Sequence, residues 1–455
     1  MTARHLFGTD GIRGRANVAP MTPELALRLG RALTLVARRG KSRAPRIVIG
    51  KDTRLSGYML ETAIASGICA MGGRVMLTGP IPTPAVANLT QSMRADVGVV
   101  ISASHNPFAD NGIKIFGPDG FKLPDSEELE IEQLLSDPKL ESSGKTGSAV
   151  GRAERLDDAV GRYIVWTKGT FPRELTLDGL HVVVDAAHGA AYRVAPAVFH
   201  ELGAEVTSIG CRPNGVNINR NCGALHPEHV AHEVKKRKAH IGVALDGDAD
   251  RVIFVDEHGD IVDGDAIMAL CATRMIKQGK LKKQTLVTTV MSNMGLDRAL
   301  EAAGGRLLRT AVGDRYVVEA MLKDRLNLGG EQSGHLIFLD HTTTGDGTVA
   351  ALQVLGIMVH EGKPLSELAR VMERVPQVLE SIKLPARKPL DQMLQLTRLV
   401  KESEERLGKA GRVLVRWSGT EPKLRLMLEG PDPEVLRSMV SDLAEAARRD
   451  LANAG

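Results

Sequence analysis

Three stretches of the chain repeat one pattern of apolar and polar positions. Each has a β-branched apolar run, a loop, an alanine- or leucine-rich segment, a glycine-containing stop and a second apolar run. Apolar runs joined through a helix are typical of parallel strands covered on both faces, so each stretch predicts a β-α-β unit. The stretches are RIVIGKDTRLSGYMLETAIASGICAMGGRVMLTG (46–79), HVVVDAAHGAAYRVAPAVFHELGAEVTSIG (181–210) and TLVTTVMSNMGLDRALEAAGGRLLRTAVG (285–313).

Breaks in this pattern divide the chain into four predicted domains. A polar, Gly/Ser-rich segment follows the first unit, and the pattern changes again after VALDGDADRVIFVDEHGDIVDGD and after RVMERVPQVLESIKLPARKPLD. The C-terminal part predicts a strand, a helix, two strands and a closing helix, which indicates a small α+β domain. We therefore expect three similar α/β domains with mixed, mostly parallel sheets (1–155, 156–255 and 256–372), a C-terminal α+β domain (373–455) and a central cleft between the four.

Composition narrows the range of partners. The 455 residues carry a net charge of +4 from intermixed charges and only 3% aromatics, which argues against a nucleic-acid surface. No run approaches the roughly 18 to 20 apolar residues of a membrane span. The four cysteines show no C-x-x-C spacing and the N-terminus has no apolar signal segment, so we expect a reduced, cytoplasmic protein.

The segment ISASHNPFADNGIKIF (101–116) places Ser104 after an apolar strand. The carboxyl end of a parallel strand is where open α/β sheets bind ligands. Lys114 returns on a short strand, and a serine beside an ammonium is a plausible nucleophile with an acid or base. A polar turn is the alternative interpretation. An acyl hydrolase is disfavoured, because there is no G-x-S-x-G elbow and His105 is the direct neighbour of Ser104.

VALDGDADRVIFVD (243–256) places Asp246, Asp248 and Asp250 two residues apart after a second apolar strand. Three carboxylates this close repel one another unless a cation lies among them, and hard oxygen ligands favour magnesium. An EF-hand does not fit, because its sixth position would be Arg251 instead of glycine and RVIFV predicts a buried strand. A solvated acidic turn is the remaining alternative.

Two further motifs are suited to a sugar phosphate. GGEQSGH (329–335) offers Glu331 and Ser333 to sugar hydroxyls, and His335 is able to move a proton near neutral pH. RWSGTEPKLR (416–425) combines backbone N–H groups, two hydroxyls and flanking arginines, which together suit a phosphate. The residues of this predicted phosphate nest are Arg416, Ser418, Gly419, Thr420 and Arg425.

These motifs together predict phosphoryl transfer through Ser104. A serine phosphate hydrolyses very slowly unaided, so it persists until a sugar hydroxyl is presented, and no nucleotide-binding motif is found in the chain. Magnesium held by the three aspartates would offset the charge that develops during transfer. Arg13 in FGTDGIRG (7–14) and Arg251 would add positive charge, and Lys114 or His335 would act as acid and base.

SASHNPFADNGIKIF, DGDADR, GGEQSGH and SGTEPKLR, in this order, resemble the α-D-phosphohexomutase superfamily across essentially the whole chain. FGTDGIRG, PNGVNINRNCG and the glutamine of GGEQSGH are most similar to its bacterial phosphoglucosamine mutase branch. The resemblance implies interconversion of glucosamine 6-phosphate and glucosamine 1-phosphate, for UDP-N-acetylglucosamine and hence the cell wall. It also implies one magnesium ion and a hexose 1,6-bisphosphate as intermediate or primer.

The resemblance also implies a role for each matching residue. Ser104 would be the phosphoserine, Asp246, Asp248 and Asp250 would bind the metal together with the Ser104 phosphoryl group, and Gly313 and Asp314 of VGDRYV would lie by the sugar. Glu331 and Ser333 would read the sugar, and Ser418, Gly419, Thr420 and Arg425 would hold its distal phosphate. Trp417 departs from the family pattern RPSGTEP, which leaves the phosphate contacts of Arg416 open.

Several alternatives stay open at this stage. A phosphomannomutase/phosphoglucomutase of the same superfamily would prefer neutral hexose phosphates, a metal-dependent phosphatase would release inorganic phosphate, and a sugar-phosphate sensor would bind without turnover. The oligomeric state is open, with a homodimer as one alternative. Ser104 would first be phosphorylated either by an activating kinase or by autophosphorylation.

Overall fold

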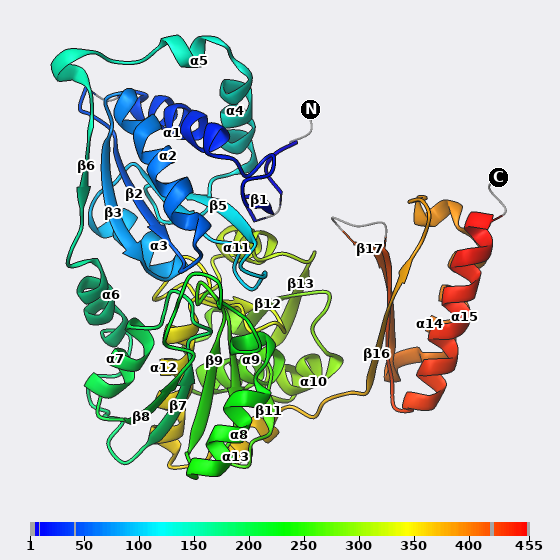
Figure 1. Ribbon diagram of the computed structural model, residues 1–455. Coiled ribbons are helices and arrows are strands. Elements are labelled where there is room, and N and C mark those ends of the chain that lie inside the picture. Colours follow the sequence, from blue (N-terminus) through cyan, green and yellow to red (C-terminus); the bar gives the residue numbers. More distant parts are fainter. Residues whose placement is uncertain (1–4, 9, 41, 419–422, 453–455) are drawn as a thin grey trace. The chain divides into compact units, whose positions relative to one another are not determined.

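The computed structural model describes residues 5–8, 10–40, 42–418 and 423–452 (Figure 1). Within these residues the strands form four sheets, of six, five, four and three strands. The chain folds into two compact units, one of residues 1–291 and 304–371 and the other of residues 292–303 and 372–455.

The six-stranded sheet belongs to the first unit and has a parallel centre with antiparallel additions on one side. Its strands lie in the order β1 (Ile12–Arg15), β5 (Asp110–Phe116), β4 (Val97–Ile101), β2 (Arg46–Lys51), β3 (Arg74–Pro80) and β6 (Arg152–Arg155). β4, β2, β3 and β6 are parallel, whereas β5 is antiparallel to both β4 and β1. The helices of this segment are α1 (Pro23–Arg38), α2 (Ser56–Ala70), α3 (Thr83–Ser92), α4 (Asp125–Ser136) and α5 (Lys139–Ser142).

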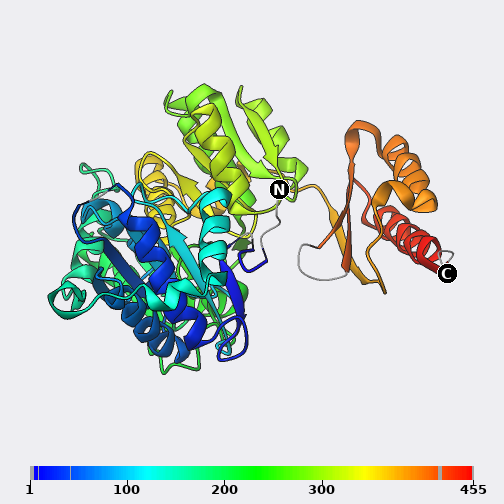
Figure 2. The ribbon, with the colours of Figure 1, turned by 90° about the horizontal axis from the view of Figure 1, so that it is seen from above.

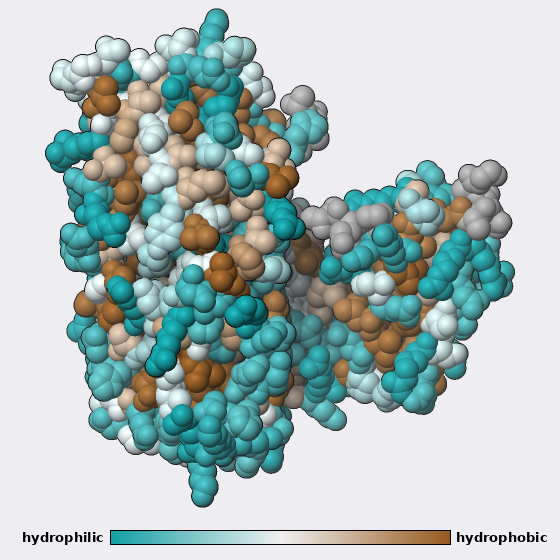
Figure 3. All heavy atoms as spheres, viewed as in Figure 1, coloured by the Kyte–Doolittle hydropathy of each residue, from teal (hydrophilic) through white to brown (hydrophobic). Residues whose placement is uncertain are grey.

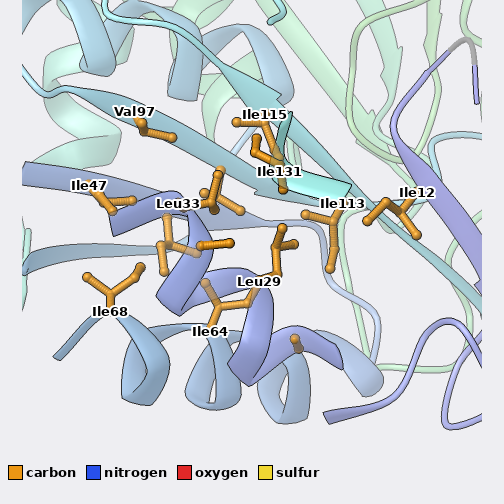
Figure 4. Packing of buried hydrophobic residues seen from close by; sticks show 14 of the residues in the cluster. Ile12, Leu29, Leu33, Ile47, Ile64, Ile68, Val97, Ile113, Ile115 and Ile131 are labelled. Atoms are coloured by element: carbon orange, nitrogen blue, oxygen red, sulfur yellow. The ribbon is translucent and has the colours of Figure 1, made fainter. Parts of the chain in front are cut away.

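Side chains alternate between the two faces of β2, and both faces are buried. Ile47 and Ile49 belong to the apolar cluster formed with α1 and α2, and Figure 4 shows Leu33 and Ile68 of these helices beside Ile47. Gly50, on the opposite face of the strand, lies against α3, since a Cβ atom at this position would stand 2.4 Å from Val86. Burial on both faces explains why β2 is a continuous apolar run in the sequence.

Two further sheets complete the first unit (Figures 1 and 2). The five-stranded sheet has the order β11 (Ile261–Val262), β10 (Val252–Val255), β9 (Ile241–Leu245), β7 (His181–Asp185) and β8 (Glu205–Ile209). The four-stranded sheet has the order β13 (Arg306–Thr310), β12 (Thr285–Thr289), β14 (Leu328–Gly330) and β15 (Leu336–Phe338). Their helices are α6 (Ala159–Lys168), α7 (Val194–Glu201), α8 (Glu228–Arg237), α9 (Gly264–Lys277), α11 (Asp314–Asp324), α12 (Gly347–Glu361) and α13 (Leu365–Leu368).

The second unit contains an antiparallel sheet in the order β16 (Gln377–Lys383), β18 (Lys423–Glu429) and β17 (Arg412–Trp417). Leu424, Leu426 and Leu428 alternate along β18 and form a core with the long C-terminal helix. Arg425 therefore points to the opposite face of the sheet. The helices of this unit are α10 (Met294–Ala302), α14 (Leu394–Leu407) and α15 (Pro433–Ala452).

The predicted fold class, a multi-domain α/β protein with mixed sheets, is confirmed, whereas the four domain boundaries and the central cleft stay predictions. In each of the three predicted β-α-β units the two strands are parallel neighbours, β2 with β3, β7 with β8 and β12 with β13. The C-terminal order of strand, helix, two strands and helix is also present. Among the described residues, no helix has the length and apolar character needed to cross a membrane. Hydrophilic residues cover most of the face shown in Figure 3, with apolar residues interspersed.

Candidate active site

Ser104 lies three residues beyond the carboxyl end of β4 and is held rigidly. Its backbone has a left-handed φ of +53° and the residue is 1% exposed. The Ser104 Oγ donates a hydrogen bond to Asp246 Oδ2 at 2.6 Å. The Ser104 N–H donates to Ser102 Oγ at 2.9 Å, and that hydroxyl donates to Asp52 at 2.7 Å. The hydroxyl of Ser104 thus points from the first sheet towards the aspartate loop of the second.

Arg54, which no motif of the sequence predicts, fixes the loop that follows Ser104. Its Nη2 donates to the carbonyl oxygens of Ser104 at 2.9 Å and Asn106 at 2.8 Å, while Nη1 donates to that of Asp110 at 3.2 Å. Its Nε donates to Asp52 at 2.8 Å, and the residue is 0% exposed. The only signal in the sequence is that a polar Asp-Thr-Arg run follows the apolar strand β2.

Asp246, Asp248 and Asp250 lie in the loop between the antiparallel strands β9 and β10. One carboxylate oxygen from each is within 4.8 Å of the others, and all three residues are buried. The Oδ1 atoms of Asp248 and Asp250 are buried without a hydrogen-bond partner. Buried carboxylate oxygens that converge in this way match the ligands that Mg²⁺ prefers, so the residues fit a divalent cation.

The electrostatics of the three aspartates support the same conclusion. Burial raises the pKa of Asp246 well above its usual value, and the neighbouring charges of Asp250 and Asp248 raise it further. Burial also acts to raise the pKa of Asp250, but the Lys114 ammonium and His335 outweigh it and hold that pKa well below its usual range. The Asp246 carboxylate is therefore the one whose charged form an added cation would favour most.

Lys114 stands on β5 and faces the same carboxylates. Its Nζ donates to Asp248 at 2.9 Å and to Asp250 at 3.0 Å, and lies 3.4 Å from an oxygen of Asp10. Burial lowers the pKa of Lys114, but these three carboxylates outweigh burial and raise it well above its usual value. The geometry therefore favours Lys114 as a permanent positive charge rather than as a base at neutral pH.

Arg13 joins the site through Asp10, whose role no motif of the sequence predicts. Arg13 and Lys122 both form ion pairs with the Asp10 carboxylate, and Lys122 Nζ donates to Asp314 at 2.5 Å. Lys122 therefore links the six-stranded sheet to the start of α11, which follows Gly313. This chain of alternating charges brings Arg13 and Asp314 into one network.

His335 lies at the end of the loop that joins β14 to β15. Its Nδ1 is 3.6 Å from Asp250 and its Nε2 is 3.5 Å from Asp314, while the Gly345 N–H donates to Nε2 at 3.2 Å. The neutral ring with its proton on Nδ1 faces Asp250 with its donor and accepts the Gly345 N–H, whereas the contact with Asp314 favours a proton on Nε2. Burial lowers the pKa of His335, but the Asp250 and Asp314 carboxylates outweigh it and raise the pKa above its usual value. The ring is thus suited to proton exchange near neutral pH.

The sugar-reading motif is close to this network. Glu331 Oε1 accepts a hydrogen bond from the Gly313 N–H at 3.2 Å, and Ser333 is exposed.

His105, next to the nucleophile, accepts a hydrogen bond from Arg251 at 2.7 Å. Burial and then the Arg251 charge lower the pKa of His105 to about 4, so this ring is neutral at physiological pH.

The first unit therefore brings together residues from all three of its large sheets: Arg13, Ser104, Lys114, Asp246, Asp248, Asp250, Arg251, Gly313, Asp314, Glu331 and His335. Residues far apart in the sequence meet here because most of them lie in loops that follow a strand or precede a helix, while Arg13 and Lys114 lie within the paired strands β1 and β5. The predicted nest lies in the second unit, and its residues Gly419 and Thr420 are outside the described residues.

The described part of the nest shows what Trp417 does. Arg416 of β17 and Arg425 of β18 are directly opposite each other in the sheet. Trp417 points to the other face, where it packs on the core and its Nε1 donates to the Lys388 carbonyl oxygen at 2.8 Å. The two guanidinium groups therefore lie on the face away from the core, where they offer the fork of donors that binds phosphate well.

Comparison with known proteins identifies the family. The chain matches four models of phosphoglucomutase/phosphomannomutase: the alpha/beta/alpha domains I (4–141), II (166–259) and III (263–375) and the C-terminal domain (359–446). A phosphoglucosamine mutase of Sorangium cellulosum is 68% identical over 452 residues, 99% of this chain and 94% of that protein.

Solved structures share the fold over the whole chain. A phosphoglucomutase/phosphomannomutase family protein of Burkholderia thailandensis has a TM-score of 0.81 at 24% identity, covering 98% of this chain and 97% of that one. An Aspergillus fumigatus N-acetylphosphoglucosamine mutase in complex with GlcNAc-6P and magnesium has a TM-score of 0.67 at 18% identity, covering 98% and 96%. With a site built on Ser104 and three buried aspartates, the chain belongs to the phosphoglucomutase/phosphomannomutase family, and within it to the phosphoglucosamine mutases.

Proposed function

We propose that the chain interconverts glucosamine 6-phosphate and glucosamine 1-phosphate, through a phosphoserine at Ser104 and a hexose 1,6-bisphosphate intermediate, and so supplies UDP-N-acetylglucosamine synthesis. The observation that carries the proposal is the Ser104 hydroxyl, 2.6 Å from Asp246 at the mouth of the three buried aspartates. The high identity to phosphoglucosamine mutases supports the amino sugar as the substrate.

One magnesium ion, held by Asp246, Asp248, Asp250 and the Ser104 phosphoryl group, would neutralise phosphoryl charge and act as a Lewis acid. The donor set supports this assignment, because it consists of hard carboxylate oxygens and includes two that lack a partner. A related fungal mutase was solved with magnesium, which supports the choice of metal.

The residues of the first unit would do the remaining work of transfer. Lys114 and Arg251 supply fixed positive charge around the phosphoryl group, and Arg13 adds to it through the Asp10 network. His335 takes the proton from the attacking sugar hydroxyl and returns it to the leaving oxygen. Gly313, Asp314, Glu331 and Ser333 would orient the sugar ring.

The distal phosphate of the sugar would be held in the second unit by Arg416, Ser418, Gly419, Thr420 and Arg425. The opposed arginines of β17 and β18 support this assignment. A phosphate held there leaves the other end of the sugar to accept the phosphoryl group of Ser104. The bisphosphate then turns by half a revolution, so that its other phosphate returns to the serine.

A coupled assay tests the proposal. The purified protein is incubated with Mg²⁺, a catalytic amount of hexose 1,6-bisphosphate and the 6-phosphates of glucosamine, glucose or mannose, and ³¹P NMR follows the 1-phosphate. We expect glucosamine 6-phosphate to give the highest kcat/KM without release of inorganic phosphate. Preference for a neutral hexose would assign a phosphomannomutase/phosphoglucomutase instead, and release of phosphate a phosphatase. First loading of Ser104, oligomeric state and cytoplasmic location stay predictions.

A further inference from the structure

The segment PNGVNINRNCG (213–223) has no part in the reaction described so far, yet it contacts the loop that carries Ser104. The Leu55 N–H donates to the Gly215 carbonyl oxygen at 2.9 Å. Asn219 Nδ2 donates to the carbonyl oxygens of Ser104 at 2.8 Å and Asn106 at 3.1 Å. Asn219 follows β8 of the five-stranded sheet, and Ser104 follows β4 of the six-stranded sheet. These hydrogen bonds therefore connect the two sheets.

Asn219 and Arg54 donate to the same two oxygens. Arg54 Nη2 reaches the carbonyl of Ser104 at 2.9 Å and that of Asn106 at 2.8 Å. A carbonyl oxygen has two lone pairs and accepts two hydrogen bonds. Each of these two oxygens therefore accepts one hydrogen bond from Arg54 and one from Asn219. The guanidinium comes from the sheet that carries Ser104, and the amide comes from the sheet that carries the aspartates.

Asn219 is itself fixed in place. It is 9% exposed, its backbone φ is +58°, which asparagine tolerates better than most residues, and its N–H donates to the Ala187 carbonyl oxygen at 2.9 Å. Gly247, between Asp246 and Asp248, packs against the same group. A Cβ atom there would lie 2.6 Å from the Ser104 carbonyl oxygen and 2.8 Å from Asn219 Nδ2.

We propose that Asn219 is a positioning residue for phosphoryl transfer, which holds the Ser104 loop in register with the aspartate loop. Asn219 acts through Ser104 and does not contact the substrate. Its side-chain amide holds the backbone of Ser104 in the left-handed conformation that points the Ser104 Oγ at Asp246. The inference rests on the proposed phosphoserine function and deepens it.

Asn219→Asp is the most direct variant, because the carboxylate has nearly the same shape but presents an acceptor to two carbonyl oxygens. Asn219→Ala removes the donors without adding a charge. Asn221→Asp is the matched control: Asn221 lies in the same segment, has a similar φ of +54° and is exposed. All three proteins are compared with wild type as full chains, loaded with phosphate on Ser104 by incubation with glucose 1,6-bisphosphate.

The first measurement is the single-turnover rate of phosphoryl transfer to glucosamine 6-phosphate, expressed per phosphorylated molecule by intact mass. We expect Asn219→Asp to lose about 10- to 100-fold in this rate and Asn219→Ala less, with KM for the sugar phosphate unchanged, as for other residues that orient reacting groups. Asn221→Asp should match wild type. A loss of folded protein alone would not alter a rate normalised in this way.

The second measurement is hydrogen exchange of the unliganded proteins, which needs no activity. Faster exchange confined to peptides covering 102–110 is expected in both Asn219 variants, with strands β2 and β3 unchanged. If Asn219→Asp and Asn219→Ala transfer phosphate at the wild-type rate, or if their 102–110 exchange equals that of Asn221→Asp, the inference is wrong. Wild-type protein without mutase activity would instead overturn the proposed function, and the exchange result would still decide the geometry.

Discussion

Replacing Lys114 with methionine keeps the volume of the side chain but removes an ammonium that forms hydrogen bonds to two buried aspartates. Lys114 Nζ lies 2.9 Å from Asp248 and 3.0 Å from Asp250, and the lysine is 1% exposed. Removing one partner from a buried ion pair costs about 3–5 kcal/mol, since the charge left behind has neither water nor a counter-ion. For a unit of this size, with an unfolding entropy of about 2.1 cal/mol/K per residue, we expect the melting temperature to fall by about 4–7 °C.

The assay is thermal unfolding of dephosphorylated wild type and Lys114→Met, each with EDTA and with excess Mg²⁺. A bound cation stabilises the folded state by about 2.7 kcal/mol when its concentration is 100 times its Kd. Because the carboxylates of the variant lack the lysine, Mg²⁺ should raise the melting temperature of the variant more than that of wild type. Lys236→Met is the control, because Lys236 pairs with Glu233 on an exposed helix face, where a salt bridge contributes little. Equal melting temperatures of Lys114→Met and wild type in EDTA, or an equal response to Mg²⁺, would refute this reasoning.

Two further predictions concern groups outside the phosphoryl site. Burial raises the pKa of Asp346 to about 6, so its ionisation costs stability as pH rises from about 4 to about 6. The free energy of unfolding of Asp346→Asn should therefore rise relative to that of wild type across this range, by roughly 3 kcal/mol at most, as measured by denaturant unfolding at each pH. A constant difference from about pH 4.5 to 7.5 would contradict this. Arg425→Gln should raise the KM for glucosamine 6-phosphate about 10-fold or more, because a charge-assisted hydrogen bond to the phosphate of the sugar is lost. The rate at which water hydrolyses the phosphoserine should change much less. An unchanged KM would remove Arg425 from the nest.

The parts of the site that the sequence predicted are those whose chemistry is local. Three aspartates at spacings of two residues repel one another wherever they lie, and a serine after an apolar strand is placed at a sheet edge by the strand itself. For the same reason the three β-α-β units followed from their apolar runs. Ser104 and Asp246 were therefore predictable as separate groups, although their hydrogen bond joins residues 142 positions apart.

The parts that the sequence did not predict depend on contacts between distant segments. Asp10 and Lys122 gain their roles only when β1 pairs with β5 and the start of α11 lies beside them. Arg54 gains its role only because four backbone carbonyl groups converge on it. The acid–base assignment of Lys114 also depended on the fold. Its pKa is set by three carboxylates from two sheets, which no local pattern reveals.

The central claim is that the phosphoryl group on Ser104 is the one transferred. Wild-type protein is dephosphorylated, then loaded in steps with glucose 1,6-bisphosphate and freed of excess reagent, and each sample is weighed intact and assayed with glucosamine 6-phosphate. The account predicts initial mutase rate in proportion to the fraction carrying one phosphoryl group, and no mass gain or turnover in Ser104→Ala. Full activity in molecules that never carry this mass, or in Ser104→Ala, would contradict it.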